Sequence, residues 1–286
     1  MKKVLVTGNN GFLASRFIEF YKDKYEIISF NKNDLDISNE SKVYNIFKEN
    51  KFDIVAHLAA ISDTGKCQSN PDLANKINLQ GTINIAKGCE LKKSTLVFAS
   101  SDQIYAGNKK EGPYSEEIII EPNNVYAESK FYAENEIKNI LDNYYNLRLT
   151  WLFSMPERNK KVNTNIITNI LNAALKKQPL NLSINEFRGM TYVYEVIENF
   201  EKLIEIPFGD YNYGSENNLS TYEIGEKVLE HMGLENRLED IIIKDIERFK
   251  DKKRDLRISN SKLKKLNINF NDTEEAIQRC IKEFKF

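Results

Sequence analysis

The first half of the chain alternates short, uninterrupted apolar runs with longer segments of helical pattern. The apolar runs read VLVTG, YEIISF, DIVAHLAA and TLVFASS, and the segment FLASRFIEFYKDK between the first two is amphipathic. A strand that is apolar throughout is buried on both faces, as in a parallel sheet whose right-handed crossover helices cover both sides. The alternation therefore predicts an α/β fold with a doubly wound parallel sheet of the Rossmann type.

The pattern becomes less regular in the second half of the chain. We expect helices over residues 41–49, 74–89, 124–143, 165–177 and 195–206, and strands in LRLTWLF, residues 147–153, and in LNLSI, residues 180–184. Beyond Trp151 the alternation loosens, and the C-terminal third is rich in charge. This change predicts a second, smaller and discontinuous lobe.

The stretch TGNNGFLA, residues 7–14, joins the first predicted strand to the first helix. Gly8 permits a sharp turn, Gly11 lets the backbone approach a pyrophosphate, and Ala14 allows close packing of helix and strand. The free N–H groups at the start of the helix would bind that anion. An ordinary glycine turn has the same pattern, but the position within a strand–helix–strand unit favours a nucleotide. The phosphate-loop pattern GxxxxGK[ST] is absent from the sequence, which argues against a nucleoside triphosphatase.

Tyr126 and Lys130 occur in VYAESK, 25 residues after Ser101 in the segment FASSDQIYAG. On a helix, a spacing of four residues puts two side chains on one face, one turn apart. A phenol transfers protons slowly near neutral pH, and an adjacent ammonium lowers its pKa by favouring the phenolate. The pair is a candidate for acid–base chemistry, although the same spacing also occurs on ordinary exposed helices.

Composition argues against several classes of partner. The chain has 41 Lys and Arg against 42 Asp and Glu, a formal net charge of −1, so binding to nucleic acid or to an anionic membrane is not expected. The apolar runs are short, so we expect neither a membrane-spanning helix nor a signal peptide. Cys67, Cys89 and Cys280 form no CxxC motif, which suits reduced thiols and a cytoplasmic location. Neither His57 nor His231 has a partner at metal-ligand spacing, so no metal site is expected.

Four motifs, in chain order, resemble those of the extended short-chain dehydrogenase/reductase family. The family patterns TGxxGFxG/A, HxAA, SSxxxYG and YxxxK are matched by TGNNGFLA, HLAA, SSDQIYA and YAESK. NLQGTIN and EPNNVY add to the resemblance, which covers residues 1–155, with weaker similarity in FRGMTYVYEV and KKRDLRISNSKL. The short length, SDQ, RLTWLF and RDLRISNSKL look most like the dTDP-4-dehydrorhamnose reductase branch. The resemblance implies an NAD(P)H-dependent oxidoreductase of polysaccharide biosynthesis, which reduces a 4-keto group of a nucleotide-activated deoxysugar.

The resemblance also implies roles for individual residues. Ser101 would bond the substrate carbonyl oxygen, Tyr126 would give it a proton, and Lys130 would hold the nicotinamide ribose. Besides Tyr126 and Lys130, the implied coenzyme-binding residues are Gly8, Asn10, Gly11, Phe12, Leu13, Asp36, Ile37, Leu58, Ala59, Ala60 and Asn78. The implied substrate-binding residues are Ser62, Ser101, Asp102, Gln103, Trp151, Arg188, Lys252 and Arg254.

The domain boundaries follow from these assignments. We expect the dinucleotide-binding domain at residues 1–155 and 185–208, and the sugar-nucleotide lobe at residues 156–184 and 209–286. Members of the family often pair through helices near the YxxxK element, which makes a homodimer plausible. The nucleotide sugar is then the expected small-molecule partner.

Some residues depart from the resemblance and leave alternatives open. The family's dehydratases carry a glutamate base where this chain has Gln103, and an amide cannot take a proton from carbon. Residues 188–196 resemble the RDFxYVxDV segment of epimerases, and Lys253 replaces a proline common in the family. An NAD-dependent nucleotide-sugar epimerase and a non-catalytic dinucleotide-binding regulatory subunit therefore remain as alternatives.

The coenzyme preference is predicted from the end of the second strand. An NAD-selective site places Asp or Glu there, and that carboxylate would repel a 2′-phosphate. This chain has Asn31 followed by Lys32, so the position carries no negative charge and offers a cation. We predict NADPH as the preferred coenzyme, with NADH still used.

Overall fold

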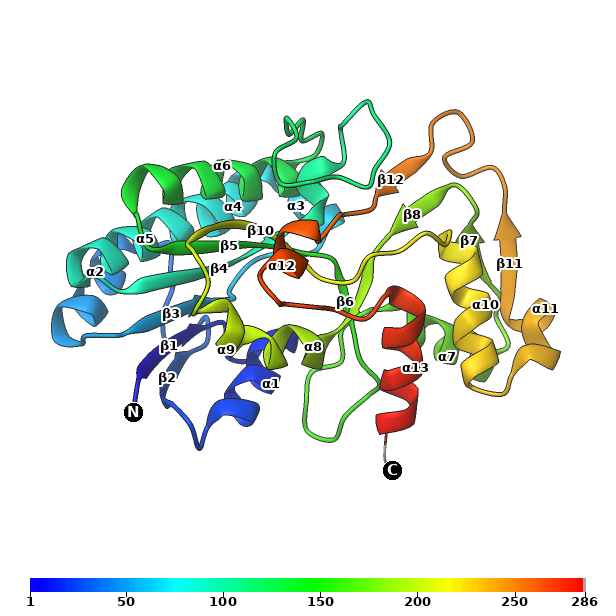
Figure 1. The fold of residues 1–286 in the computed structure, drawn as a ribbon, viewed down its shortest axis with the longest axis horizontal. Coiled ribbons are helices and arrows are strands. Elements are labelled where there is room, and N and C mark those ends of the chain that lie inside the picture. The colour runs from blue at the N-terminus through cyan, green and yellow to red at the C-terminus, as the bar shows by residue number, and fades with distance from the viewer. Residues whose placement is uncertain (285–286) are drawn as a thin grey trace. The chain divides into compact units, whose positions relative to one another are not determined.

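A six-stranded sheet forms the centre of the first of two structural units (Figure 1). The computed structural model describes residues 1–284. The strand order is β10 (Gly209–Tyr213), β5 (Tyr144–Leu149), β4 (Thr95–Ser101), β3 (Ile54–His57), β1 (Lys3–Thr7) and β2 (Glu26–Phe30). The pairs β1–β2, β1–β3 and β3–β4 are parallel. Since β2 and β3 flank β1 on opposite sides, the winding direction reverses at β1, where folds of this kind bind ligands.

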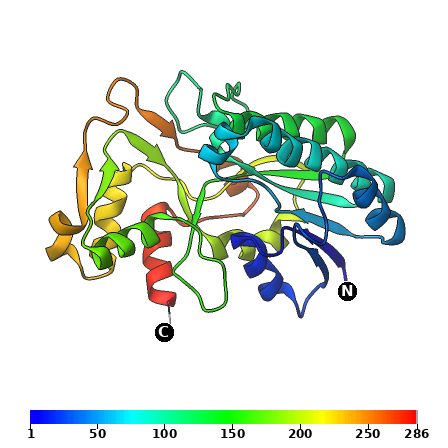
Figure 2. The same cartoon turned by 180° about the vertical axis from the view of Figure 1, so that it is seen from behind.

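Helices cover both faces of this sheet. Helix α1 (Phe12–Tyr21) lies on one face, whereas α2 (Glu40–Glu49), α5 (Gly81–Lys92) and α6 (Val125–Ile140) lie together on the other face. Figure 2 shows the same separation from behind. The predicted doubly wound sheet is confirmed.

The main core of this unit lies between the sheet and the layer formed by α2, α5 and α6. Each buried aliphatic or aromatic side chain there stabilises the fold by roughly 1.5–3 kcal/mol relative to exposure. The buried residues include Leu5, Val43, Phe47, Phe52, Val55, Ile85, Ala86, Cys89, Leu96, Phe98, Ala133 and Ile137. The apolar stripes seen in the sequence thus meet in one continuous cluster.

The helix expected over residues 74–89 is interrupted. It consists of α4 (Pro71–Ala74), a π-helical turn over Asn75–Gln80 and then α5. A π-helical turn inserts an extra residue into a helix and is frequent at functional sites. Here the turn directs the Asn78 side chain to the backbone of Ile61, which receives one hydrogen bond from it and donates another.

The other predicted elements differ in their limits. The helix expected over residues 124–143 ends at Ile140, because β5 already begins at Tyr144. The single strand expected in LRLTWLF is two strands, since the chain leaves β5 at Leu149 and enters β6 (Trp151–Phe153) in a different sheet. Two remaining elements of the first unit are short: α3 (Thr64–Ser69) and a 3₁₀ turn over Asp102–Tyr105.

The division into units differs from the domain boundaries expected from the sequence. The first unit comprises residues 1–109, 119–148 and 206–211, and the second comprises residues 110–118, 149–205 and 212–286. Residues 110–118, 149–155 and 185–205, assigned above to the dinucleotide-binding domain, belong to the second unit, and residues 209–211, assigned above to the lobe, belong to the first. The main reason is that β6 pairs with β9 (Met190–Tyr192) and not with the central sheet. The functional assignment of the two parts remains a prediction.

The second unit contains short parallel strand pairs and helices. Strands β7 (Leu180–Ser183), β8 (Glu186–Arg188) and β9 pair with β11 (Ile242–Asp245), β12 (Arg254–Leu256) and β6, respectively. The helix expected over residues 195–206 is two short helices that meet at Asn199, whose side chain donates to Asn269 O at 2.9 Å. The helices are α7 (Ile166–Lys176), α8 (Val193–Glu198), α9 (Phe200–Leu203), α10 (Thr221–His231), α11 (Leu238–Ile241), α12 (Ser261–Lys265) and α13 (Thr273–Glu283), with a 3₁₀ turn over Glu235–Arg237.

A close contact between α5 and α2 gives a test of the packing. A Cβ atom at Gly88 would lie 2.7 Å from Phe47 Cγ and closer still to other atoms of that buried ring. We predict that Gly88→Ala lowers the free energy of unfolding by about 1–3 kcal/mol, because overpacking exceeds the gain in helix propensity. Urea denaturation measures the change, with the exposed neighbour Lys87→Ala as control, expected within about 0.5 kcal/mol of wild type. A Gly88→Ala protein more stable than wild type would show that Phe47 yields freely.

Candidate active site

The turn after β1 has a geometry that requires glycine. Gly8 has a φ of +74°, and a Cβ atom there would lie 2.9 Å from Ala59 Cα. The N–H groups of Gly8 and Asn9 both donate to Phe30 O, at 2.8 and 3.1 Å. The turn is therefore fixed to the end of β2 and packed against the loop that follows β3.

The start of α1 is able to receive an anion. The Gly11 N–H donates back to Gly8 O at 2.7 Å, and the first helical hydrogen bond joins Ser15 N to Gly11 O. Among the described residues, no side chain caps this helix, and its first turn carries no acidic residue. The N–H groups of the first turn and the positive end of the helix dipole therefore fit the diphosphate of a dinucleotide.

Tyr126 and Lys130 lie one turn apart on α6, as the sequence predicts. Tyr126 is 7% exposed and packs with Cys67 and Ala74, whereas Lys130 is 2% exposed. Lys130 Nζ donates to Ala99 O at 2.7 Å and lies 6.0 Å from the centre of the Tyr126 ring. Burial lowers the pKa of Lys130 to about 7, against the opposing effect of Glu134.

Ser101, the third proposed catalytic residue, is the last residue of β4. Its Oγ accepts from Gln103 N at 3.2 Å and donates to Asp102 Oδ1 over a long 3.3 Å contact. Asp102 and Gln103 are both buried in the 3₁₀ turn that follows. A hydroxyl held by a long hydrogen bond can turn toward another acceptor at low cost.

His57 joins β1 to the π-helical turn through a buried network. Thr7 Oγ1 accepts from the N–H groups of Leu58 and Ala59, both at 3.1 Å, so its proton goes to His57 Nδ1 at 2.8 Å. Thr82 Oγ1 donates to Asn78 O, so it accepts from His57 Nε2 at 3.0 Å. His57 is therefore a neutral Nε2–H tautomer, and burial together with repulsion from Lys130 lowers its pKa to about 3.

Asn78 continues this network toward α6. Its amide bonds both backbone groups of Ile61, at 2.8 and 3.0 Å, and donates to Ser129 Oγ at 3.3 Å. Ser129 in turn donates to Tyr126 O at 2.8 Å. The loop after β3 and the start of α6 are thus joined by Asn78, which sequence analysis assigned to the coenzyme.

The end of β2 holds the residues expected to choose the coenzyme. Asn31 Oδ1 accepts from Asn33 N at 2.7 Å and from Asp34 N at 3.3 Å, which closes a turn. Lys32 is exposed. Asp36 bonds Ser38, and this hydrogen bond is the main cause that lowers the Asp36 pKa.

The substrate-binding candidates divide between the two units. Ser62, Ser101, Asp102 and Gln103 lie in the first unit, and Trp151, Arg188, Lys252 and Arg254 lie in the second. Within the second unit, the Arg188 guanidinium lies 5.3 Å from the Trp151 ring centre. Arg254 forms an ion pair with Glu186 at 3.0 Å, while Lys252 is exposed. The two candidates Trp151 and Arg188 are therefore neighbours.

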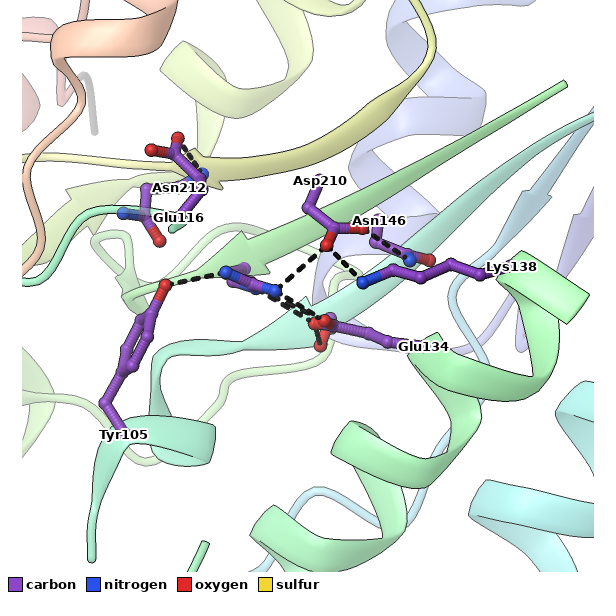
Figure 3. Close-up of polar contacts among 9 residues, drawn as sticks. Tyr105, Glu116, Glu134, Lys138, Asn146, Asp210 and Asn212 are labelled. Atoms are coloured by element: carbon purple, nitrogen blue, oxygen red, sulfur yellow. Dashed lines mark hydrogen bonds and ion pairs between the residues drawn. The ribbon is translucent and has the colours of Figure 1, made fainter. Parts of the chain in front are cut away.

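A buried charge network in the first unit escaped the sequence analysis (Figure 3). Arg148 on β5 is 1% exposed and donates to Glu134 at 2.8 Å, to Asp210 at 3.1 Å and to the Tyr105 hydroxyl at 2.9 Å. Asp210 also pairs with Lys138. The signal in the sequence was an arginine inside the apolar run LRLTWLF, which requires a buried carboxylate partner.

Within residues 1–284, no three His, Cys, Asp or Glu side chains are placed to hold a metal ion. Over the same residues, no helix combines the length and the apolar character that a bilayer crossing needs. The described cysteines Cys67, Cys89 and Cys280 are buried, and no disulfide joins them.

Comparison with known proteins adds to this geometry. The model of the RmlD substrate binding domain matches residues 1–286. The chain belongs to this family. Among its relatives, the spore coat polysaccharide biosynthesis protein SpsK of Bacillus subtilis is 28% identical over 83% of this chain and 82% of its own. The dTDP-4-dehydrorhamnose reductase of Aggregatibacter actinomycetemcomitans is 25% identical over 83% of this chain and 85% of its own.

The fold of this RmlD-family chain is also found in solved structures. The dTDP-4-dehydrorhamnose reductase of Bacillus anthracis, crystallised in complex with NADP, superposes with a TM-score of 0.87. The match covers 99% of this chain and 98% of that one at 24% identity. The superposition confirms the Rossmann-type fold, and the matches to the RmlD family and to a named reductase bear out the resemblance seen in the sequence.

The buried His57 of this RmlD-family protein predicts a dependence of stability on pH. The folded-state pKa lies below the unfolded one, so the unfolded chain binds more protons between pH 3 and 6.5, and stability falls as pH drops through that range. From pH 7 to pH 5 we expect His57 to contribute a loss of about 2 kcal/mol. Urea denaturation at several pH values should show this loss in wild type and in His231→Gln, but a flatter curve in His57→Gln. An equally steep curve in His57→Gln would show that other groups cause the acid sensitivity.

Proposed function

We propose that this protein reduces the 4-keto group of a nucleotide-activated deoxysugar with NADPH, as a dTDP-4-dehydrorhamnose reductase does. The single observation that carries the proposal is the buried Tyr126–Lys130 pair on α6, in a chain that also carries Ser101 at the end of β4. Membership of the RmlD family and the similarity to named reductases support the substrate class.

The residues of the first unit fit the coenzyme. The glycine turn and the start of α1 would hold the diphosphate, and Asn31 and Lys32 at the end of β2 would meet the adenosine ribose. Leu58, Ala59 and Ala60 follow β3 next to that turn. The bound coenzyme would supply a hydride to the carbonyl carbon.

The protein's own groups would supply the proton and stabilise the charge. As hydride reaches the carbon, negative charge develops on the carbonyl oxygen, and hydroxyl donors placed beforehand stabilise it. Ser101 would turn from its 3.3 Å contact with Asp102 to donate to that oxygen. Tyr126 would transfer its proton to the oxygen, and the Lys130 ammonium would favour the resulting phenolate.

A substrate panel tests the proposal directly. Purified protein with NADPH receives a series of 4-keto-6-deoxy nucleotide sugars, and the absorbance of the reduced nicotinamide is followed over time. We expect oxidation of NADPH with at least one of them and formation of the 4-hydroxy product. Inactivity with the whole panel would contradict the reductase. In a parallel assay with NAD⁺ and 4-hydroxy nucleotide sugars, interconversion without net oxidation would show an epimerase instead.

The role of Tyr126 gives a sharper prediction. Tyr126→Phe removes one hydroxyl and should lower turnover about 10²- to 10⁴-fold, the usual contribution of a positioned proton donor. NADPH binding, measured by fluorescence titration, should stay close to wild type because the ring and its packing are kept. The exposed Tyr132→Phe on the same helix is the matched control. Turnover near wild type in Tyr126→Phe would assign the proton to another group.

The coenzyme preference can be tested at Asn31. An exposed charge pair contributes about 1 kcal/mol or less, so Lys32 should give NADPH roughly a fivefold advantage over NADH. Asn31→Asp keeps the acceptor that closes the turn with Asn33 but adds a negative charge, and should reverse the preference. Steady-state kinetics with both coenzymes measures the ratio, which Asn33→Asp should change less. An unchanged ratio in Asn31→Asp would show that this strand end does not select the coenzyme.

The proposal extends to location and assembly. We infer a cytoplasmic enzyme, since nicotinamide coenzymes and reduced cysteines are found there. We also infer a homodimer, because Leu91 on α5 and Tyr132 on α6 are 49% and 50% exposed although both are large and apolar. Exposed apolar side chains on neighbouring helices are suited to pairing with a second copy.

A further inference from the structure

Glu134 lies on the same face of α6 as the two proposed catalytic residues. Tyr126, Lys130 and Glu134 are spaced by four residues, so each follows the previous one by about one helical turn. Glu134 is 0% exposed and accepts from Ser100 Oγ at 2.5 Å. Ser100 is the neighbour of Ser101 in β4, so Glu134 links the strand that carries Ser101 to the helix that carries Lys130.

The charges around Glu134 are arranged in a connected set. Arg148 contacts Glu134 through Nε and Nη2, with the shortest bond at 2.8 Å, and Asp210 accepts from the same guanidinium at 3.1 Å. Asp210 also forms an ion pair with Lys138 and accepts a hydrogen bond from the Asn146 side chain (Figure 3). Asp210 therefore keeps other hydrogen-bond donors if Arg148 is removed. Glu134, in contrast, contacts both Arg148 and Ser100 of β4.

Lys130 has few groups that could balance its charge. The titratable groups that interact with it include Glu134 and Tyr126 on α6, Cys67 on α3 and His57 at the end of β3. Burial raises the pKa of the Cys67 thiol and lowers that of His57, so both are neutral at pH 7. Among these groups, Glu134 provides the favourable negative charge.

We propose that Glu134 is a positioning residue for the reaction: its carboxylate holds the Lys130 ammonium in its charged form and fixes β4 against α6 through Ser100. The proposal rests on the proposed function for its consequence in catalysis, since a charged Lys130 is needed there. Its electrostatic part concerns the free protein and holds without any substrate. Glu134 does not touch the reacting atoms in this scheme but acts through Lys130 and Ser101.

The first readout is the titration of Lys130 in the free protein. Lysine labelled with ¹³C at Cε is followed by NMR as pH is varied, and the signal that titrates near neutral pH is assigned by its loss in Lys130→Met. In Glu134→Gln, which keeps the shape of the side chain but not its charge, the midpoint should fall by about one unit or more. An unchanged midpoint would overturn the proposal.

The second readout is the pH profile of turnover. With a lower Lys130 pKa, Glu134→Gln should lose about fivefold or more in kcat at pH 7 and recover toward wild type as the pH is lowered. Glu134→Asp keeps the charge and should keep the wild-type pH midpoint. A loss of activity that is the same at every pH would indicate a merely structural role and contradict the proposal.

Matched variants separate the charge from the packing. Asp210→Asn removes the other carboxylate on Arg148 and should leave the Lys130 midpoint unchanged, even if it lowers stability. If Glu134→Gln fails to fold because Arg148 loses its partner, the double variant Glu134→Gln/Arg148→Met removes both charges together. The Lys130 midpoint should be lower in this variant than in Arg148→Met alone, because only the Glu134 carboxylate distinguishes the two proteins, and equal midpoints would overturn the proposal.

The outcomes distinguish this inference from the proposed function. A shifted Lys130 midpoint in a protein that reduces no nucleotide sugar would contradict the function and keep the electrostatic role of Glu134. If the protein reduces a nucleotide sugar but the Lys130 midpoint does not shift in Glu134→Gln, the proposed function holds and the electrostatic role of Glu134 is contradicted.

Discussion

The hydroxyl of Thr7 is the contact on which the candidate coenzyme site depends. It lies at the end of β1, where the winding of the sheet reverses, and it bonds two N–H groups of the next loop and the ring of His57. This one side chain joins the end of β1, just before the glycine turn, to the loop after β3. Through His57 it is also linked to Thr82 of α5. A buried hydroxyl with one proton and two lone pairs can make these three bonds and no more. That full use of its bonding capacity fixes the orientation of His57 and, through Thr82, the π-helical turn.

The electrostatics of the first unit follow from how its charges are buried. Arg148 and Glu134 are buried and Asp210 is partly buried, and their charges compensate one another. Lys130 is also buried, yet its closest bond is to a backbone carbonyl, that of Ala99. Removing an ammonium from water lowers its pKa, and the opposing effect of Glu134 offsets this only in part, so the pKa of Lys130 falls to about 7. Burial of Lys130 therefore lowers the stability of the fold, whereas the charge of Arg148 is balanced by Glu134 and Asp210.

The sequence predicted the features that depend on local pattern. The strand–helix alternation gave the doubly wound sheet, and the four-residue spacing placed Tyr126 and Lys130 on one face of α6. Features that depend on tertiary contacts were not predictable. The break between β5 and β6 lies inside an apolar run, and it becomes visible when Thr150 is seen bonded to Thr191 in the second unit. Glu134 and Arg148 are distant in sequence from the β10 residue Asp210, so their network could not be assembled from spacing.

The π-helical turn at residues 75–80 has a consequence for the length of the chain in this region. Such a turn contains one residue more than an α-helix would use over the same rise. Deleting one residue there would restore a regular helix over the same rise, so the segments before and after the turn could keep their places while the residues inside it changed direction. Asn78 would then no longer be aimed at the backbone of Ile61. A single extra amino acid in this helix therefore sets its contact with the loop after β3.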